Sequence, residues 1–258
     1  MLKHKNITAF CISVFFVLVV LYFYFEVKWW FILLPILLWL IVTVWGSSEI
    51  RLGYFTKTYC NNPNEKQRKI GLSFDDGPHP ITEKVLDVLQ KNNVKATFFC
   101  IGSQIEKHPD IFKRILTEGH IVGNHSYSHS NYFGIFSTKK VKEEIDHTNT
   151  IILQLSGKKA LFFRPPFGVT NPRIAKAIEQ TKHFAIGWNI RSLDTVIKEE
   201  SKIIKRVKSK VALGGIILLH DTSLKTVTVL EQILLFLKSE NYTIVPIDKL
   251  LNLQAYEN

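Results

Sequence analysis

The sequence predicts an α/β fold: a distorted (β/α)7 barrel related to the eight-stranded TIM barrel, preceded by an N-terminal transmembrane helical hairpin. Seven short apolar runs in residues 69–258 alternate with segments of helical periodicity, which indicates a parallel sheet with crossover helices. Two uncharged runs long enough to span a membrane precede them. An open, doubly wound sheet is the alternative. The polar residues of interest follow many strands rather than two, and this favours the barrel.

The N-terminal 46 residues contain the two apolar runs. The first covers the nineteen residues Ile7–Phe25 and the second covers Trp29–Gly46, and each is about as long as a helix that crosses roughly 30 Å of hydrocarbon. A cleaved signal peptide is one alternative because Lys3 and Lys5 precede the first run, and a single bent or interfacial element is another. The first run ends in bulky aromatic residues and a second run follows at once, so we expect a two-span membrane anchor over residues 1–46.

Turn residues separate this anchor from the alternating region. Residues 47–68 are polar and contain the run Asn61–Asn64, so we expect a linker there and a separate domain over 69–258. Buried strands are predicted near 70–74, 95–101, 120–124, 160–163, 183–188, 215–219 and 242–245. Apolar stripes predict helices around Ile81–Leu89, Ile111–Leu116 and Val141–Ile152, the last capped by Ser137 or Thr138, with further helices over 171–182, 199–212 and 226–238.

Composition limits the classes of function. An apolar content of 46% excludes disorder. The net charge is +11, and 30 basic and 20 acidic side chains remain after residue 50; such a surface attracts anionic lipid or acidic polymers. The lysines are scattered over amphipathic helices rather than gathered in one block, so we expect no nucleic-acid partner, and no obligate protein partner is indicated. The odd set Cys11, Cys60 and Cys100 indicates neither a disulfide framework nor a zinc ribbon.

Two adjacent carboxylates follow the first predicted strand, in the run Ser73-Phe74-Asp75-Asp76-Gly77-Pro78. Neighbouring charges at a strand end are costly unless a metal or a counter-charge lies nearby. Their side chains point in different directions, so one is able to bind a metal while the other reaches a water molecule. A solvated Asp-Asp turn that caps the next helix is the alternative.

Two histidines, His125 and His129, follow the third predicted strand. A spacing of four residues places both imidazoles on one face of a helical turn, where they are able to share a cation. Such a pair is often incidental when it stands alone. Together with Asp76 it forms the set of two imidazoles and one carboxylate that leaves a zinc ion an open position for water, which is typical of catalytic sites.

Further polar residues follow later strands. Arg164 enters the turn Pro165-Pro166-Phe167-Gly168, where it is able to hold a carboxylate such as Asp75. Taken alone, this is an ordinary loop. The sixth strand ends at His220 and Asp221; a histidine there is able to donate a proton to a leaving group, with Asp194 tuning it. The alternative is a histidine at the barrel rim whose ring nitrogens form ordinary hydrogen bonds and have no catalytic role. All these groups follow predicted strand ends, where barrels assemble active sites. Unrelated polar residues would not all fall at the same rim of the barrel by coincidence.

The chain resembles the polysaccharide deacetylases, also called carbohydrate esterase family four, over roughly residues 69–250. The matching motifs are SFDDGP at 73–78, HSYSH at 125–129, RPPFG at 164–168, Asp194, and Leu218-Leu219-His220, in the order that the family has them. The resemblance implies hydrolysis of N-acetyl or O-acetyl groups of an acetylated glycan such as peptidoglycan or a chitin-like polymer. It also implies one divalent metal, Zn²⁺ first, with Co²⁺, Mn²⁺ or Ni²⁺ as alternatives.

The resemblance also implies a role for each matching residue. Asp75 would be the base, supported by Arg164, and His220 the general acid, with Asp194 as its charge partner. The metal ligands would be Asp76, His125 and His129. The Phe167 N–H would help bind the oxyanion, and Leu218 would line the acetyl pocket. The fourth motif departs from the family's Asp-x-x-Asp-Trp, because Arg191 and Thr195 replace the first Asp and the Trp, which puts the substrate groove and the tuning of His220 in question.

Two other functions are compatible with part of the sequence, and the charges near the N-terminus conflict with the expected side of the membrane. A ferrous oxygenase also uses two histidines and one carboxylate, but an Asp-Asp turn in an alternating α/β chain argues against it. An inactive membrane-anchored glycan-binding protein needs neither the base Asp75 nor the acid His220. A two-span anchor puts both ends of the chain in one compartment; Lys3 and Lys5 weakly favour the cytoplasm, whereas a cell-surface glycan requires a domain outside the membrane.

Overall fold

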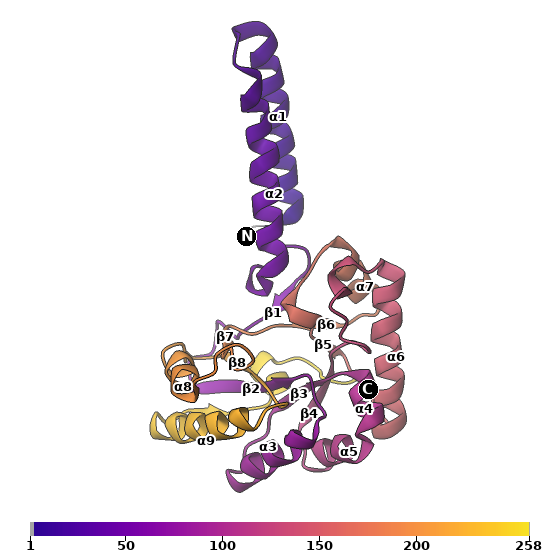
Figure 1. Ribbon diagram of the computed structural model, residues 1–258, viewed down its shortest axis with the longest axis vertical. Helices are drawn as coiled ribbons and strands as arrows, with labels where there is room; N and C mark the ends of the chain where they lie inside the picture. The colour runs from indigo at the N-terminus through magenta and orange to yellow at the C-terminus, as the bar shows by residue number, and fades with distance from the viewer. Residues whose placement is uncertain (1–2, 258) are drawn as a thin grey trace.

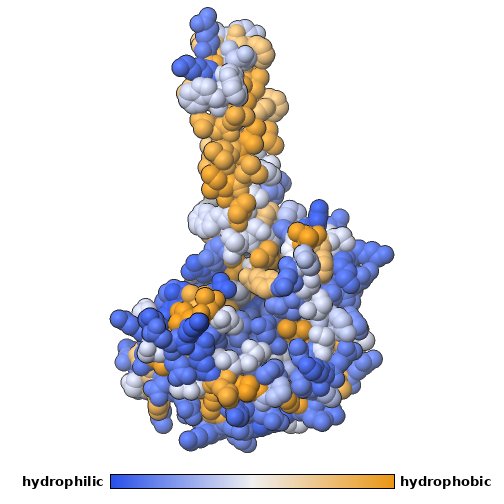
Figure 2. All heavy atoms as spheres, in the orientation of Figure 1, coloured by the Kyte–Doolittle hydropathy of each residue, from blue (hydrophilic) through white to orange (hydrophobic). Residues whose placement is uncertain are grey.

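The computed structural model describes residues 3–257 and has two parts, a projecting helical hairpin and an α/β domain (Figure 1). Helix α1 (His4–Phe25), the 3₁₀ turn η1 (Trp29–Ile32) and α2 (Leu33–Ser48) form the hairpin. Its surface is apolar along most of its length, unlike the largely hydrophilic domain (Figure 2). By length and composition these two helices are candidate membrane spans. A signal sequence has the same length and apolar composition.

A curled parallel sheet forms the centre of the domain. The seven predicted strands are present as β2 (Lys69–Asp75), β3 (Thr97–Cys100), β4 (Ile121–Asn124), β5 (Phe162–Phe163), β6 (Phe184–Ile186), β8 (Ile216–His220) and β9 (Thr243–Ile244). The order is β1-β6-β5-β4-β3-β2-β8-β7, with β9 on β2, and every pairing between these strands is parallel.

The sheet curls into a distorted barrel, as the sequence predicts. Strand β7 (Ile190–Arg191) pairs with β8, and β6 pairs with β5 at the opposite side of the order. Only residues 187–189 separate β6 from β7, so the chain itself joins the two sides. Residues 187–189 thus interrupt what would otherwise be one continuous strand formed by β6 and β7. Gly187 has no room for a side chain, because a Cβ there would lie 2.5 Å from the Cys60 sulfur. This interruption makes the barrel irregular.

The segment expected to be a linker packs against the domain for part of its length. It contributes the two-residue strand β1 (Thr58–Tyr59), which pairs with β6. The Asn62 N–H donates to the carbonyl of Gly214 at 2.8 Å, and the Asn62 side chain donates to that of Leu250 at 2.9 Å. Neither β1 nor β7 lies in an apolar run, because Thr58 and Arg191 are polar, and for this reason the sequence did not indicate them.

Helices surround the sheet and cover its strands. The predicted helices are α3 (Pro80–Lys91), α5 (Pro109–Thr117), α6 (Thr138–Ser156), α7 (Pro172–Gln180), α8 (Glu200–Lys208) and α9 (Leu224–Ser239). Ser137 caps α6, since its side chain accepts from the Lys140 N–H. Two short helices, α4 (Gly102–Lys107) and α10 (Ile247–Leu251), were not predicted. All three cysteines, expected to be unpaired, are free and buried.

Both ends of the hairpin lie at one junction, where the hairpin meets the rest of the chain. The His4 N–H donates to the carbonyl of Tyr54 at 3.0 Å. At the end of α2, the Ser47 hydroxyl donates to the carbonyl of Thr170 at 2.6 Å, and the Thr170 N–H donates back to the carbonyl of Ser47 at 3.0 Å. Thr170 lies in the loop that follows β5. The hairpin is therefore bonded to one of the loops at the carboxyl ends of the strands.

Candidate active site

Asp75, the last residue of β2, is held by a buried arginine. Arg164 follows β5, is fully buried, and donates from Nη1 to Asp75 Oδ1 at 2.6 Å and to the Ser73 hydroxyl at 2.9 Å. Its other nitrogens donate to the carbonyls of Ile186 and Gly187, and its guanidinium carbon lies 3.9 Å from the centroid of the Phe99 ring. A buried charge pair in which every guanidinium nitrogen donates a hydrogen bond fixes the Asp75 carboxylate in one orientation.

Asp76, His125 and His129 come together beside Asp75. The Nε2 atoms of both histidines lie 3.5 Å from Asp76 Oδ1, and the possible ligand atoms of the three residues all lie within 4.8 Å of one another. Asp76 Oδ1 is buried without a hydrogen-bond partner. Two ligands about 2.1 Å from one zinc ion at a tetrahedral angle stand about 3.4 Å apart. The donor set and its spacing therefore fit a divalent metal.

The hydrogen bonds and charges around these residues also suit a metal. His125 Nδ1 lies 2.7 Å from the carbonyl of Arg164; only an N–H pairs with a carbonyl, so Nδ1 carries a hydrogen and Nε2 is the nitrogen that faces Asp76. Burial lowers the pKa of His129, and the nearby His125 lowers it further. Burial alone would raise the pKa of Asp76, but the imidazoles of His125, His220 and His129 outweigh it and lower that pKa.

Strained backbone at these loops aims the side chains. Five residues of the site loops have left-handed φ angles, namely Asp76 (76°), Ser126 (65°), His129 (45°), Phe167 (60°) and Leu193 (62°). Outside the site, five other described non-glycine residues have a positive φ, and three of them are asparagines, which tolerate this conformation. The serine, phenylalanine and leucine here tolerate a positive φ less well, and such strain is typical of functional sites.

A buried glutamate that the sequence did not indicate holds the histidine loop. Glu144 of α6 accepts at Oε2 from the N–H of Tyr127 at 3.1 Å, the N–H of Ser128 at 2.7 Å and the Ser128 hydroxyl at 2.8 Å. The signal is present in the sequence, because Glu144 falls on the apolar face of α6 that carries Val141 and Ile145. A charged residue on a buried helix stripe indicates a specific partner.

The turn after Arg164 offers a backbone donor. The N–H groups of Gly168 and Val169 close this turn by donating to Pro165 and Pro166, and the N–H of Phe167 takes part in neither bond. Gly168 is required here because its φ is +69° and a Cβ would lie 2.6 Å from the ring of Trp188. Trp188, whose ring centroid lies 5.4 Å from the Arg164 guanidinium carbon, is thus a second residue near the site that the sequence did not indicate.

His220 and Asp194 form the opposite side of the site. Strand register pairs Asp75 directly with His220 on adjacent strands. His220 Nδ1 donates to Asp194 Oδ1 at 2.8 Å, and the His220 backbone N–H donates to Oδ2 at 2.8 Å. Burial lowers the pKa of His220, but the hydrogen bond and charge of Asp194, with Asp75 and Asp76, raise it to about 9. The side chains of Ser192 and Thr226 also donate to Asp194.

The neighbouring residues of these motifs have different positions. Leu218 is buried in β8, two residues before His220. Asp221 is buried on the other side of the strand end, where Thr82 donates to it at 2.6 Å, and burial raises its pKa to about 7. The guanidinium of Arg191 lies 5.8 Å from the centroid of the Trp188 ring. Thr195 is exposed, so no aromatic wall stands beside His220 at that position.

A (β/α) barrel with an Asp-His-His group and a buried Asp-Arg pair at the carboxyl ends of its strands has the architecture of metal-dependent hydrolases. The polysaccharide deacetylase family model matches residues 62–186. The chain is 34% identical over 219 residues to an uncharacterised 30.6 kDa protein of Geobacillus stearothermophilus, covering 83% of this chain and 80% of that protein. This chain belongs to the polysaccharide deacetylase family, and the resemblance seen in the sequence is confirmed.

Two of the relatives are peptidoglycan deacetylases by name. The peptidoglycan-N-acetylglucosamine deacetylase PgdA of Listeria monocytogenes is 36% identical over 184 residues, which cover 71% of this chain but only 39% of PgdA. The crystal structure of the Bc1960 peptidoglycan N-acetylglucosamine deacetylase matches with a TM-score of 0.72 and 31% identity, covering 78% of this chain and 94% of that one. A pseudoenzyme of the same family, BA3943 from Bacillus anthracis, matches with a TM-score of 0.70 and 28% identity, over 76% of this chain and 69% of that one.

Proposed function

We propose that this chain is a membrane-anchored, metal-dependent deacetylase that removes N-acetyl groups from amino sugars of a cell-surface polysaccharide such as peptidoglycan; O-acetyl groups are the alternative. One observation carries the proposal: the fixed carboxylate of Asp75, at the end of β2, lies beside the Asp76-His125-His129 group and is paired in register with His220 of β8. Base, metal ligands and acid are thus side by side, an arrangement that binding alone does not require.

Asp75 acts as the general base. Arg164 occupies its Oδ1, which leaves Oδ2 directed toward the histidine side, 3.8 Å from His125 Nε2. A water molecule held between Oδ2 and the acetyl carbon gives its proton to Asp75 as it attacks. The guanidinium stays in place throughout and prevents the carboxylate from turning away.

Asp76, His125 and His129 would hold the metal, Zn²⁺ first, with Co²⁺, Mn²⁺ or Ni²⁺ as alternatives. When bound, a divalent ion supplies Lewis acidity, which favours ionisation of water and polarises the acyl carbonyl. The chain's own contribution is to present the lone pairs of both Nε2 atoms and one carboxylate oxygen toward a common point. Glu144 fixes the loop that carries the histidines.

His220 acts as the general acid, and a backbone donor assists it. The N–H of Phe167 donates to the oxyanion of the tetrahedral intermediate, and Leu218 lines the pocket for the acetyl methyl group. His220 carries a proton at neutral pH because Asp194 raises its pKa; it gives this proton to the departing amine from Nε2, while Nδ1 stays bonded to Asp194. Acetate and a free amino sugar result.

Acetate release tests the proposal directly. The purified full chain is incubated with peptidoglycan, chitin oligomers and acetylated xylan, with and without a chelator and with the metal restored afterwards. We expect release from an N-acetylated glycan that the chelator abolishes and the metal restores. An inactive glycan-binding protein is the second candidate, because a pseudoenzyme is among the structures that this chain resembles. Glycan binding without acetate release would establish that alternative.

The hairpin of α1 and α2 is proposed to be a two-span membrane anchor over residues 1–46, joined through 47–68 to a catalytic domain over 69–258. Phe16 and Ile41, at 62% and 58% exposure, illustrate an apolar surface that lipid would cover. A cell-surface substrate places the catalytic domain outside the cytoplasm. Added protease should therefore digest the domain in intact cells, and protection there would place it inside.

A further inference from the structure

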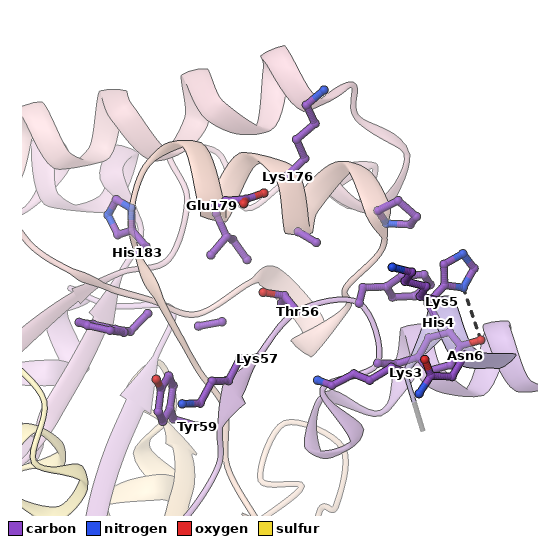
Figure 3. A pocket seen from close by; sticks show the side chains of 17 residues that line it. Lys3, His4, Lys5, Asn6, Thr56, Lys57, Tyr59, Lys176, Glu179 and His183 are labelled. Atoms are coloured by element: carbon purple, nitrogen blue, oxygen red, sulfur yellow. Dashed lines mark hydrogen bonds between the residues drawn. The ribbon is translucent and has the colours of Figure 1, made fainter. Parts of the chain in front are cut away.

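A basic cleft of about 900 Å³ lies at the foot of the hairpin, bounded by the start of α1, the segment that leads into β1, and α7 (Figure 3). Of the described residues that line it, four are lysines and one is acidic: Lys3, Lys5, Lys57, Lys176 and Glu179. No residue that we assign to the catalytic rim lines it. The excess of positive charge favours an anionic ligand, and the cleft is separate from the site that binds the glycan.

The lysine charges in this cleft are not neutralised by the protein. Lys3 Nζ donates to the carbonyl of Gly53 at 2.6 Å, and Lys57 Nζ lies 4.6 Å from the centroid of the Tyr59 ring. Figure 3 shows Lys57 beside Tyr59, and Lys176 extending outward from α7. Within residues 3–257, none of the four lysines forms an ion pair. Helix α1 also begins here with no acidic residue in its first turn, so its positive end is uncompensated.

The position of the cleft identifies the source of the anion. It lies where the apolar surface of the hairpin gives way to the hydrophilic domain (Figure 2). In a membrane that the hairpin spans, this junction stands at the level of the lipid headgroups. Tyr54, Phe55 and Tyr59 also line the cleft, and aromatic residues of this kind concentrate at that level.

We propose that this cleft binds the phosphate of an anionic phospholipid headgroup in the bilayer that holds the hairpin. The proposal rests on the membrane placement proposed above. A bound lipid would fix the tilt of the domain against the membrane, because the cleft is built jointly from the anchor and from α7 of the domain. Each basic side chain near an anionic surface strengthens binding on the order of fivefold.

The test uses the full chain in nanodiscs that contain equal amounts of phosphatidylglycerol and phosphatidylcholine. Native mass spectrometry then counts the lipids that stay bound. We expect a preference for phosphatidylglycerol that falls at least tenfold in the triple variant Lys5→Gln, Lys57→Gln, Lys176→Gln. These lysines donate no hydrogen bond within the described residues, so their replacement spares the fold. The triple variant Lys5→Arg, Lys57→Arg, Lys176→Arg should keep the preference.

A matched control removes the same charge elsewhere. The variant Lys84→Gln, Lys91→Gln, Lys238→Gln changes exposed positions of α3 and α9, at the end of the domain away from the hairpin (Figure 1), and should bind lipid as the parent does. Equal retention by the parent and the cleft variant would overturn the proposal. So would inorganic phosphate that stabilises the detergent-solubilised chain as strongly as phosphatidylglycerol does, because the ligand is then a free anion.

Failure of the membrane placement gives a different result. Alkaline carbonate removes peripheral proteins from membranes but leaves spanning ones. A chain that carbonate removes is not anchored, and both ideas are then wrong. A chain that resists carbonate yet shows no preference between the two lipids is anchored, and only the assignment of the cleft is wrong.

Discussion

The two sides of the candidate site differ in how closely they follow the family pattern. On one side, Asp75, Asp76, the two histidines and Arg164 all match it, and buried contacts fix Asp75 and Arg164. On the other side, His220 and Asp194 match it, but Arg191 and Thr195 do not, and Thr195 is exposed. Under the proposed mechanism, the contrast separates what the activation of water requires from what the surroundings of the proposed acid tolerate.

Position in the fold accounts for the difference. The side of Asp75 depends on contacts between β2, β4 and β5 inside the barrel, so each change there leaves a buried charge or donor without its partner. The side of His220 depends on the buried Asp194 and the two hydroxyls that donate to it, while its outer wall faces solvent. Substitutions on the outer wall therefore cost little stability and act on the substrate groove instead.

The largest effect is expected on the first side, from Asp75→Asn. The amide keeps the shape of the carboxylate but does not accept the proton of water, so kcat should fall by about 10²–10⁴-fold. Metal content should stay near that of the parent chain, since Asp75 is not among the proposed ligands. Acetate release gives the rate and atomic absorption gives the metal content. Turnover at the parent rate would remove Asp75 from its role as base.

The next effect is on metal content, from His125→Ala. Loss of one of three ligands should lower the metal bound after dialysis to well under half of the parent value, with activity falling in parallel. His147→Ala is the matched control, because His147 is exposed and stacks on Tyr127 without facing Asp76. Full metal occupancy in the His125 variant would contradict the ligand assignment.

An intermediate effect is expected on the second side, from Asp194→Asn. His220 must be protonated to act as the acid, and its pKa of about 9 keeps it so at neutral pH. In the parent chain kcat/KM should therefore decline as pH rises through about 9. Without the charge of Asp194 the pKa falls toward the ordinary histidine value of about 6.5, so the decline should begin at lower pH and activity at pH 8 should drop at least tenfold.

The pH profile separates this role from a purely structural one. Thr226→Val is the matched variant, because it removes one donor to Asp194 and leaves the charge. We expect it to lower activity without moving the alkaline decline by more than a few tenths of a pH unit. An alkaline decline at the same pH in the Asp194 variant and the parent would show that Asp194 does not tune His220.

The sequence predicted which polar residues lie together at strand ends, because adjacency in the chain and the barrel topology together place them at one rim. Asp75, Asp76 and His220 are of this kind. It did not predict Glu144 or Trp188, because each acts through a contact with a loop that is distant along the chain. Strands β1 and β7 were also not predicted, since neither lies in an apolar run and their pairing depends on the finished sheet.

The smallest effect is expected from Thr195→Trp, which restores the aromatic residue that the family motif has beside the acid. Thr195 is exposed and its neighbour Val196 is 70% exposed, so a larger ring overpacks nothing and the free energy of unfolding should change by less than about 0.5 kcal/mol. The ring gives a sugar an apolar face to stack on, which should lower KM about two- to fivefold and leave kcat within twofold. Thr195→Ala is the control, and its KM should match that of the parent. A fall in kcat for the tryptophan variant would show instead that this wall governs His220, and that the two sides of the site are coupled.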